Sequence, residues 1–391
     1  MLNKVLLIFA ILVCLRCGDD KCSIYFGEIE PDAIPIIFGA NTISQKGRLE
    51  HGISFSPDNK ELLFGVLSKT SETGSIHFAK KNNNDWTKPE LFKPLEGESV
   101  FLPYFTPDGR SVLFAKSKSE VDNGNSNIGL LTKINDKWQL SEKKMTSINS
   151  ISREANASMT NDGAIYFSSN RNCLGQENCY TADLFYAKSN GGEYLNAEEL
   201  FDLNSSVDEE SVFISPKEDY MLFCRFTDMK SWMDLYISYQ DKYNKWTKPK
   251  ILDASINSKD WDRRPFVSFD NTYLFFTRLQ IGETGLTESD IYWVNTTKVF
   301  SPFVYHSPGQ IKLEVGKGFH VKIPADYFKD IDDNDLKIDI EDNSLDWLQY
   351  NAETMIMSGS AVSAGSYDVV FTATDNFFNT TNDTIILFVK K

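Results

Sequence analysis

The feature that most constrains the fold of this chain is an internal repeat of about fifty residues. In five segments a polar turn containing Pro, Asp, Asn or Gly separates two apolar and aromatic runs, which is a β-hairpin pattern. The segments are Ser54–Phe64, Tyr104–Phe114, Ser158–Phe167, Phe213–Phe223 and Val267–Phe276. The steps are 50, 54, 55 and 53 residues between the anchor positions Asp58, Asp108, Asp162, Lys217 and Asp270.

Each hairpin is followed by a third strand-like run, a polar turn with an aromatic residue, and a fourth run. Four short strands in a unit of this length are typical of a β-propeller blade. The last unit has no evident fourth strand, and we expect Ile34–Ser44 to supply it and close the ring. This arithmetic predicts an all-β protein with five four-stranded blades. Six blades are the alternative, if a degenerate blade uses the N-terminal stretch and residues 295–308.

Three elements of the repeat carry a family resemblance. They are the SPDG-type turn, the D-[LI]-[FY] strand at Asp183, Asp234 and Asp290, and the W-x-x-P element at Trp86 and Trp246. Together they resemble the WD40-like propeller repeat of exported bacterial proteins, a family that includes TolB-like propellers. The resemblance covers roughly residues 30 to 300 and implies the fold, but such propellers have many functions.

The pattern changes after residues 298–309. About seven strands with alternating polarity in the last ninety residues predict an Ig-like sandwich. This part resembles the cadherin-like, dystroglycan-type Ig family at Phe328, Trp347, Gly359, residues 364–367 and residues 372–375.

That second resemblance implies a calcium site in an acidic turn. Its expected ligands are carboxylates, which calcium prefers, at Asp330, Asp332, Asp333, Asp335 and, from a late strand, Asp375. The alternative is a solvated acidic turn that ends a strand. No cofactor other than calcium is expected.

The N-terminus predicts export. Lys4 precedes an apolar run, Val5–Leu15, whose length suits a signal peptide and is too short to span a bilayer. Cys17, followed by Gly and two Asp, resembles the lipidated cysteine of bacterial lipoproteins, although Arg16 departs from that pattern. We therefore expect an outer membrane-anchored lipoprotein, periplasmic or on the cell surface, with plain secretion as the alternative.

The expected domains are a signal peptide (1–17), a tether (18–29), the propeller (30–300), a linker (301–309) and the sandwich (310–391). In an oxidising compartment Cys173 and Cys179, which share one polar loop, are expected to form a disulfide.

Composition excludes several classes of function. The formal net charge of −15 disfavours nucleic-acid binding. Four scattered histidines argue against a multi-histidine metal enzyme. The chain has no G-x-S-x-G elbow, P-loop or dinucleotide fingerprint.

One acidic position recurs eight residues before the anchor, at Glu50, Glu154, Glu209 and Asp262. It precedes the innermost strand of each blade, so the acids should gather near one mouth of the central channel, flanked by Arg153, Arg263 and Arg264.

Three interpretations of these acids stay open. The acids accept backbone hydrogen bonds from a neighbouring loop; or they form, with Arg263, a ligand site at the channel mouth; or they serve a glycosidase. The last is least favoured, because repeated acids imply similar environments and a glycosidase needs carboxylates with different pKa values. Trp232, Trp261 and Trp293 are further candidates for stacking on a sugar, although packing between blades is commoner.

The resulting hypothesis is a non-catalytic binding or scaffold protein of the cell envelope that recognises a protein or glycan through its propeller faces. The alternative is a carbohydrate-active enzyme that uses the channel carboxylates. Membrane contact is expected only through the N-terminal lipid.

Overall fold

The computed structural model describes residues 24–69, 73–83, 85–117, 125–143, 145–176, 179, 181–226, 232–282, 285–341 and 345–391. This part of the chain is all-β apart from three short 3₁₀ segments, η1 (Lys93–Leu95), η2 (Arg171–Cys173) and η3 (Thr296–Lys298). None of its helices has the length and hydropathy to cross a membrane. Cys17 and the predicted signal peptide lie outside the described residues.

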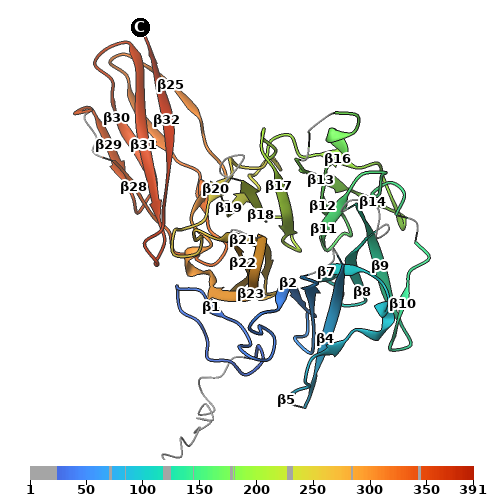
Figure 1. Cartoon of the computed structure of the whole chain (residues 1–391). Helices are drawn as coiled ribbons and strands as arrows, with labels where there is room; N and C mark the ends of the chain where they lie inside the picture. The colour runs from blue at the N-terminus through green and yellow to red at the C-terminus, as the bar shows by residue number, and fades with distance from the viewer. Residues whose placement is uncertain are drawn as a thin grey trace, which may run out of the picture.

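The sequence repeat becomes a repeat of antiparallel four-stranded groups (Figure 1). In the described part of the chain, three of these groups are separate sheets, and the first and the last are joined by the parallel bridge of β2 (Leu49–Phe55) with β23 (Gly285–Asn295) into one nine-stranded sheet. The first three groups are β2, β3 (Glu61–Leu67), β4 (Gly74–Asn82) and β6 (Glu90–Leu91); β7 (Val100–Phe105), β8 (Ser111–Ser117), β9 (Ser126–Ile134) and β10 (Lys137–Leu140); and β11 (Glu154–Met159), β12 (Ile165–Ser169), β13 (Asp183–Ala187) and β16 (Glu198–Glu199).

The last two groups follow the same order. They are β17 (Glu209–Ile214), β18 (Tyr220–Phe226), β19 (Met233–Tyr239) and β20 (Lys250–Ile251); and β21 (Trp261–Val267), β22 (Tyr273–Gly282), β23 (Gly285–Asn295) and β1 (Ile36–Ile37). Short ribbons extend the outer edges, formed by β5 (Asp85–Trp86) on β4 and by β14 (Ser189–Asn190) with β15 (Glu193–Tyr194).

The groups close into a ring. Their innermost strands neighbour one another in the cyclic order β2, β7, β11, β17, β21 and back to β2. The N-terminal strand β1 pairs with β23, with Ile36 opposite Trp293 and Ile37 opposite Tyr292. The prediction that the segment before the first hairpin completes the last group is thus confirmed. The strand from the start of the domain thus completes the last group, and β23 also pairs with β2 of the first group, so the ring is closed.

The core of this propeller-like domain is aromatic. Tyr25 is fully buried, with its ring 5.1 Å from that of Phe55 and 5.4 Å from that of Tyr273. Phe38 packs edge-on against Trp293 at 5.2 Å. The domain therefore includes residues from position 24 onward that the sequence reading placed in a tether, because their aromatic rings fill the space where the ring closes.

The C-terminal part is the predicted Ig-like sandwich. One sheet contains β25 (Gln310–Glu314), β32 (Thr380–Lys390), β31 (Gly365–Thr374) and β28 (Lys337–Ile340), and the other contains β26 (Gly318–Lys322), β30 (Ile356–Ser360) and β29 (Leu348–Asn351). Tyr327, Met357, Phe371 and Ile385 are buried in their common core. In Figure 1 the sandwich, coloured orange to red, projects from one side of the propeller-like domain.

The predicted linker is part of a packed junction. β24 (Phe303–Val304) pairs with β27 (Phe328–Lys329), and the Phe303 ring stacks on that of Tyr239 at 4.4 Å. Asn379 of the sandwich donates through Nδ2 to the carbonyl of Thr297 at 2.9 Å. Residues 301–309, predicted as a linker, thus form part of this junction, with the Phe303 ring buried against Tyr239.

Candidate binding site at the channel mouth

Every innermost strand is interrupted by a β-bulge at the same place. The register shifts between Glu50 and Ile53 in β2, and at the equivalent points of the other four strands. Each bulge contains a residue with positive φ: Gly52 (76°), Leu102 (58°), Asn156 (55°), Ser211 (62°) and Arg264 (59°). This backbone is strained for Leu, Ser and Arg, and bulges of this kind often redirect side chains at functional sites.

The five bulges converge on the channel axis. Together with the residues that follow them they line a cavity of about 40 Å³. A Cβ added to Gly52 would lie 3.4 Å from Cδ2 of Leu102 and 3.9 Å from Cβ of Arg264, so these bulges are in contact. The space left is enough for a few water molecules.

The Arg264 guanidinium lies among the residues that line this cavity. Its Nε donates to Nε2 of His51 at 3.1 Å, and its Nη1 donates to Asn156 Oδ1 at 2.5 Å and to the Ser211 hydroxyl. Because Nε2 of His51 accepts, the ring proton belongs on Nδ1. Burial, and then the charges of Arg264 and Arg263, hold the pKa of His51 well below its usual range, so His51 is neutral.

Three arginines surround one carboxylate at the mouth of the channel. Glu210 has a side chain only 2% exposed, and it is approached by Arg153 Nη2 at 3.2 Å, by Arg264 Nη2 at 3.4 Å and by Arg263. A second acid, Asp208, lies near Arg153 and Arg263. Burial, with the neighbouring charges of Arg264 and Arg153, lowers the pKa of Arg263 well below its usual range.

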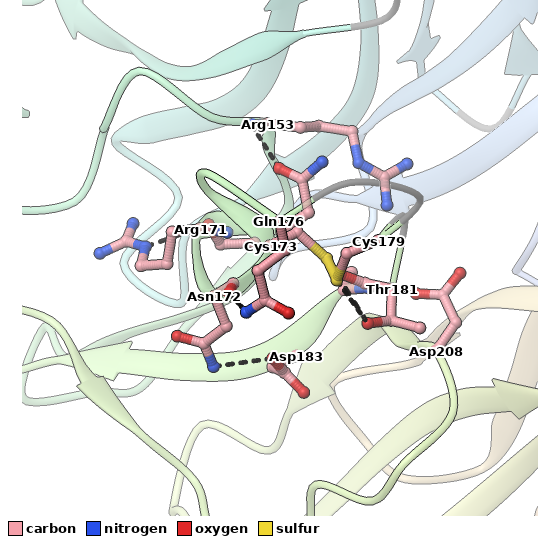
Figure 2. Close-up of a disulfide and its surroundings, with 12 residues drawn as sticks. Arg153, Arg171, Asn172, Cys173, Gln176, Cys179, Thr181, Asp183 and Asp208 are labelled. Carbon is pink, nitrogen blue, oxygen red and sulfur yellow. Dashed lines mark hydrogen bonds between the residues drawn. A yellow bond between two sulfur atoms is a disulfide. The ribbon is translucent and has the colours of Figure 1, made fainter.

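A disulfide braces the loop beside this cluster. Cys173 and Cys179 are joined with their Cα atoms 5.2 Å apart, in the connection between β12 and β13. Arg153 donates its backbone N–H to Asn170 Oδ1 at 2.8 Å, and Asp208 accepts the N–H of Ala182 at 2.7 Å. Figure 2 shows Arg153 and Asp208 beside the closed loop. Both ends of the loop are therefore tied to residues of the mouth.

The four acids predicted at the mouth are fully buried, and each is held by its own set of donors. Glu209 is fully buried and accepts from Ser205 N at 3.1 Å, from the Ser205 hydroxyl and from Arg225 Nε at 2.8 Å. Arg225 also donates to the carbonyl of Leu203 at 2.6 Å. The other acids are equally buried, with Glu154 held by Ser150 and Arg171, Asp262 by Ser258 and Arg278, and Glu50 by Gln45 and Arg48.

The pattern of these pairs favours the structural interpretation of the acids. Glu154, Glu209 and Asp262 each join the loop entering an innermost strand to the strand beside it. Both partners of Glu50 lie in the segment that enters its own strand. In the second group, where Val100 replaces the acid, Glu98 pairs instead with Lys116 at 2.8 Å. Burial raises the pKa values of Glu50, Glu209 and Asp262. Of the predicted ligand-binding set, Arg263 lies in the mouth cluster.

Sequence reasoning missed Glu210, His51, Asn156 and Ser211. Two signals were available. Successive residues of a strand point to opposite faces, so the residue after each structural acid should face the channel side. Pro103 and Pro265 interrupt innermost strands, where a proline cannot donate to the ladder and marks a bulge.

The predicted sugar-stacking tryptophans separate in the structure. Trp293 is fully buried in the core. Trp232 is 47% exposed, and Trp261 is half-buried with its ring 5.1 Å from that of Phe226. Trp261 begins β21, two residues before Arg263, and Trp232 directly precedes β19.

The predicted calcium ligands are arranged as backbone braces. Asp333 accepts the N–H of Asp335 at 2.8 Å and that of Asn376 at 2.7 Å, and Asp375 accepts the N–H of Asn379 at 2.7 Å. Burial, and then the charge of Asp332, raises the pKa of Asp330 to about 8. In the part of the chain that the structure describes, no three or more His, Cys, Asp or Glu are placed to hold a metal. Calcium binding at this turn stays a prediction.

Residues 301–390 match the family model described as "Putative Ig domain". No curated protein sequence matches the chain. Similar solved structures include one described as "Glycoside hydrolase". It is 12% identical, the match covers 68% of this chain and 91% of that chain, and the TM-score is 0.44. A gluconolactonase from Xanthomonas campestris is 10% identical, with 68% of this chain and 96% of that chain covered and a TM-score of 0.39. An endo-arabinanase from Bacillus licheniformis is 12% identical, with 63% of this chain and 94% of that chain covered and a TM-score of 0.38. These scores carry no argument about activity, and the propeller-like fold stands on its own strand pairing.

Proposed function

We propose that this chain is a non-catalytic binding protein of the cell envelope, which recognises a protein or glycan partner at the channel mouth. The proposal rests on one observation, namely that Arg153, Arg263 and Arg264 converge on Glu210 at the channel mouth. Two buried arginines on one innermost strand and a partly exposed arginine next to another, beside a loop closed by a disulfide, make a preorganised recognition surface.

The finer features of the fold belong to the same proposal. Five groups whose innermost strands form a cycle support a five-bladed propeller of the WD40-like kind. We assign the sandwich to the cadherin-like variety, as a second unit rigidly joined to the ring. We also keep export with lipidation at Cys17, in agreement with a disulfide in the mature part of the chain.

The enzyme alternative has less physical support. Pockets for small molecules measure roughly 300–1,000 Å³, whereas the channel cavity is about 40 Å³. A sugar ring does not fit into it, and the repeated acids are each held by a serine or backbone donor and an arginine. Recognition at the surface needs no such space.

The test compares two single arginine removals in the full mature protein. Arg153→Ala removes a half-exposed guanidinium of the mouth, and Arg110→Ala removes an exposed one from a hairpin turn at the opposite end of the blades. Purified protein is immobilised and probed with a panel of envelope glycans and with envelope protein extract, while glycan hydrolysis is followed in parallel. We expect specific retention that Arg153→Ala abolishes and Arg110→Ala preserves, without hydrolysis. Glycan cleavage by the wild type, or equal retention by both variants, contradicts the proposal.

A further inference from the structure

The mouth cluster has more cationic donor capacity than the protein itself satisfies. Three guanidinium groups carry up to fifteen N–H donors between them, and they share the carboxylates of Glu210 and Asp208. Arg263 is 91% buried, yet its Nε has no hydrogen-bond partner among the described residues. His51 adds no charge. Three cations therefore face two anions, and Asp208 already accepts the N–H of Ala182.

A buried cation whose charge is not matched by an anion raises the free energy of the folded protein, so its presence needs a physical explanation. Buried charges in proteins are almost always paired, and an unpaired buried donor loses its hydration without compensation. Replacing Arg263 by an apolar residue would remove that cost if the cluster served only to hold strands together. An anion from outside the protein would supply the missing charge and accept from the donors that the protein leaves unpaired.

Arg153 is the part of the cluster that such an anion can reach. Its side chain is 28% exposed, against 10% for Arg263 and 8% for Arg264. The exposure of the three arginines thus decreases from Arg153 at the solvent to Arg264 in the channel. A guanidinium binds a carboxylate through two parallel hydrogen bonds, a geometry that a neutral sugar hydroxyl cannot match.

Aromatic rings next to the arginines narrow the ligand class. The Arg263 guanidinium lies 5.5 Å from the ring centre of Trp261, whose ring packs edge-on against Phe226. Phe226 is paired with Met233, the residue that follows the exposed Trp232. Arg263 and Phe226 both pack on Trp261, so the exposed indole in this part of the chain is that of Trp232. A pyranose ring can pack its apolar C–H groups on an exposed indole face while its carboxylate reaches the cations.

We propose that the channel mouth binds a carboxylate-bearing glycan, with the uronate carboxylate held by Arg153 and Arg263 and the sugar ring placed against Trp232. This inference rests on the proposed binding function and specifies its ligand class. An acidic peptide offers the same carboxylate without a sugar ring, and it is treated as a separate outcome of the test.

The experiment titrates each probe into the purified full mature protein and measures the binding affinity by calorimetry. The probes are trigalacturonate, its neutral counterpart galactotriose, and a short poly-glutamate peptide. The variants are Arg153→Ala, Trp232→Ala and the control Arg110→Ala, each first checked for an unchanged thermal midpoint. We expect trigalacturonate to bind at least about tenfold more tightly than galactotriose, and both mouth variants to weaken it by about tenfold or more. Arg110→Ala should bind as the wild type does. Raising the salt concentration should weaken trigalacturonate binding.

The outcomes separate this inference from the function on which it rests. Equal binding of the acidic and neutral trisaccharides, or trigalacturonate binding that Arg153→Ala leaves unchanged, overturns the carboxylate assignment. Poly-glutamate binding that depends on Arg153, without trigalacturonate binding, overturns the glycan assignment and leaves recognition at the mouth intact. If no probe binds at about 10 mM but envelope extract is retained through Arg153, the ligand class is wrong and the binding function stands.

Discussion

Replacing Glu209 by Gln should destabilise the propeller-like domain without any direct effect on the channel mouth. The carboxylate of Glu209 is fully buried and accepts from the backbone and hydroxyl of Ser205 and from Arg225. Gln keeps the shape and one acceptor oxygen, but it presents an NH₂ group to the other donors. Arg225 then becomes a largely buried cation without its anion.

The expected size of the effect follows from that geometry. Removing one partner of a buried ion pair costs about 3–5 kcal/mol, and the remaining contact of Arg225 with the carbonyl of Leu203 places this case at the low end. At roughly 2–4 °C per kcal/mol for domains of this size, a loss of about 3 kcal/mol lowers the thermal midpoint by roughly 6–12 °C. Differential scanning calorimetry of the wild type and the variant measures the shift.

The second repeat offers a matched control for the same substitution. Glu98 and Lys116 form the corresponding pair, but both side chains are 44% exposed. An exposed pair contributes about 0–1 kcal/mol, so Glu98→Gln should move the midpoint by no more than about 4 °C. If Glu209→Gln and Glu98→Gln shift the midpoint equally, while Glu209→Gln abolishes ligand binding or glycan hydrolysis, the structural interpretation of the repeated acids is refuted.

Three further predictions concern other parts of the chain. Cys173→Ser with Cys179→Ser should lower stability by about 2 kcal/mol, as expected for a loop with a sequence separation of 6, and a reductant should reproduce the loss in the wild type only; denaturation midpoints with and without reductant test this, and identical midpoints contradict it. Since the pKa of Asp330 is raised to about 8 from an unfolded value of about 3.9, its stabilising contribution is complete below that lower value and is lost as the pH rises through 8. Asp330→Asn should therefore raise the thermal midpoint relative to wild type more at alkaline pH than at acidic pH, and a pH-independent difference would exclude this assignment. Cys17→Ser should move the protein from the membrane fraction to the soluble fraction of expressing cells, as followed by immunoblotting; unchanged membrane association would leave no role for lipidation at this residue.

Local patterns were sufficient to predict the architecture. Alternating side chains and tight turns such as Ser56–Asn59 specify hairpins without reference to distant residues. The closing strand was found because the fourth run of the last unit was missing and Ile34–Ser44 had no partner of its own. The boundaries were less accurate, because the burial of Tyr25 and Phe303 depends on packing partners distant in sequence.

The channel mouth could be predicted only in part. Periodicity placed Arg263 near the channel, but the bulges turn one residue per strand toward the axis, and a bulge has no strict sequence requirement. His51, Asn156, Ser211 and Arg264 come from four repeats and meet only when the ring closes. No spacing rule within one repeat contains that information.

The positions that repeat and the positions that vary have different roles in this chain. The buried acid is nearly the same in four repeats, as expected of a contact that every blade needs in order to hold its entry loop. The bulge position is different in every repeat, namely Gly52, Leu102, Asn156, Ser211 and Arg264. A symmetric ring places these five residues at equivalent points around one axis, so any asymmetry at the channel arises from their side chains. The residue type that repeats in this sequence is therefore one that holds the fold together. The proposed ligand site lies where the repeats differ, and the single arginine at the axis, Arg264, is the clearest such difference.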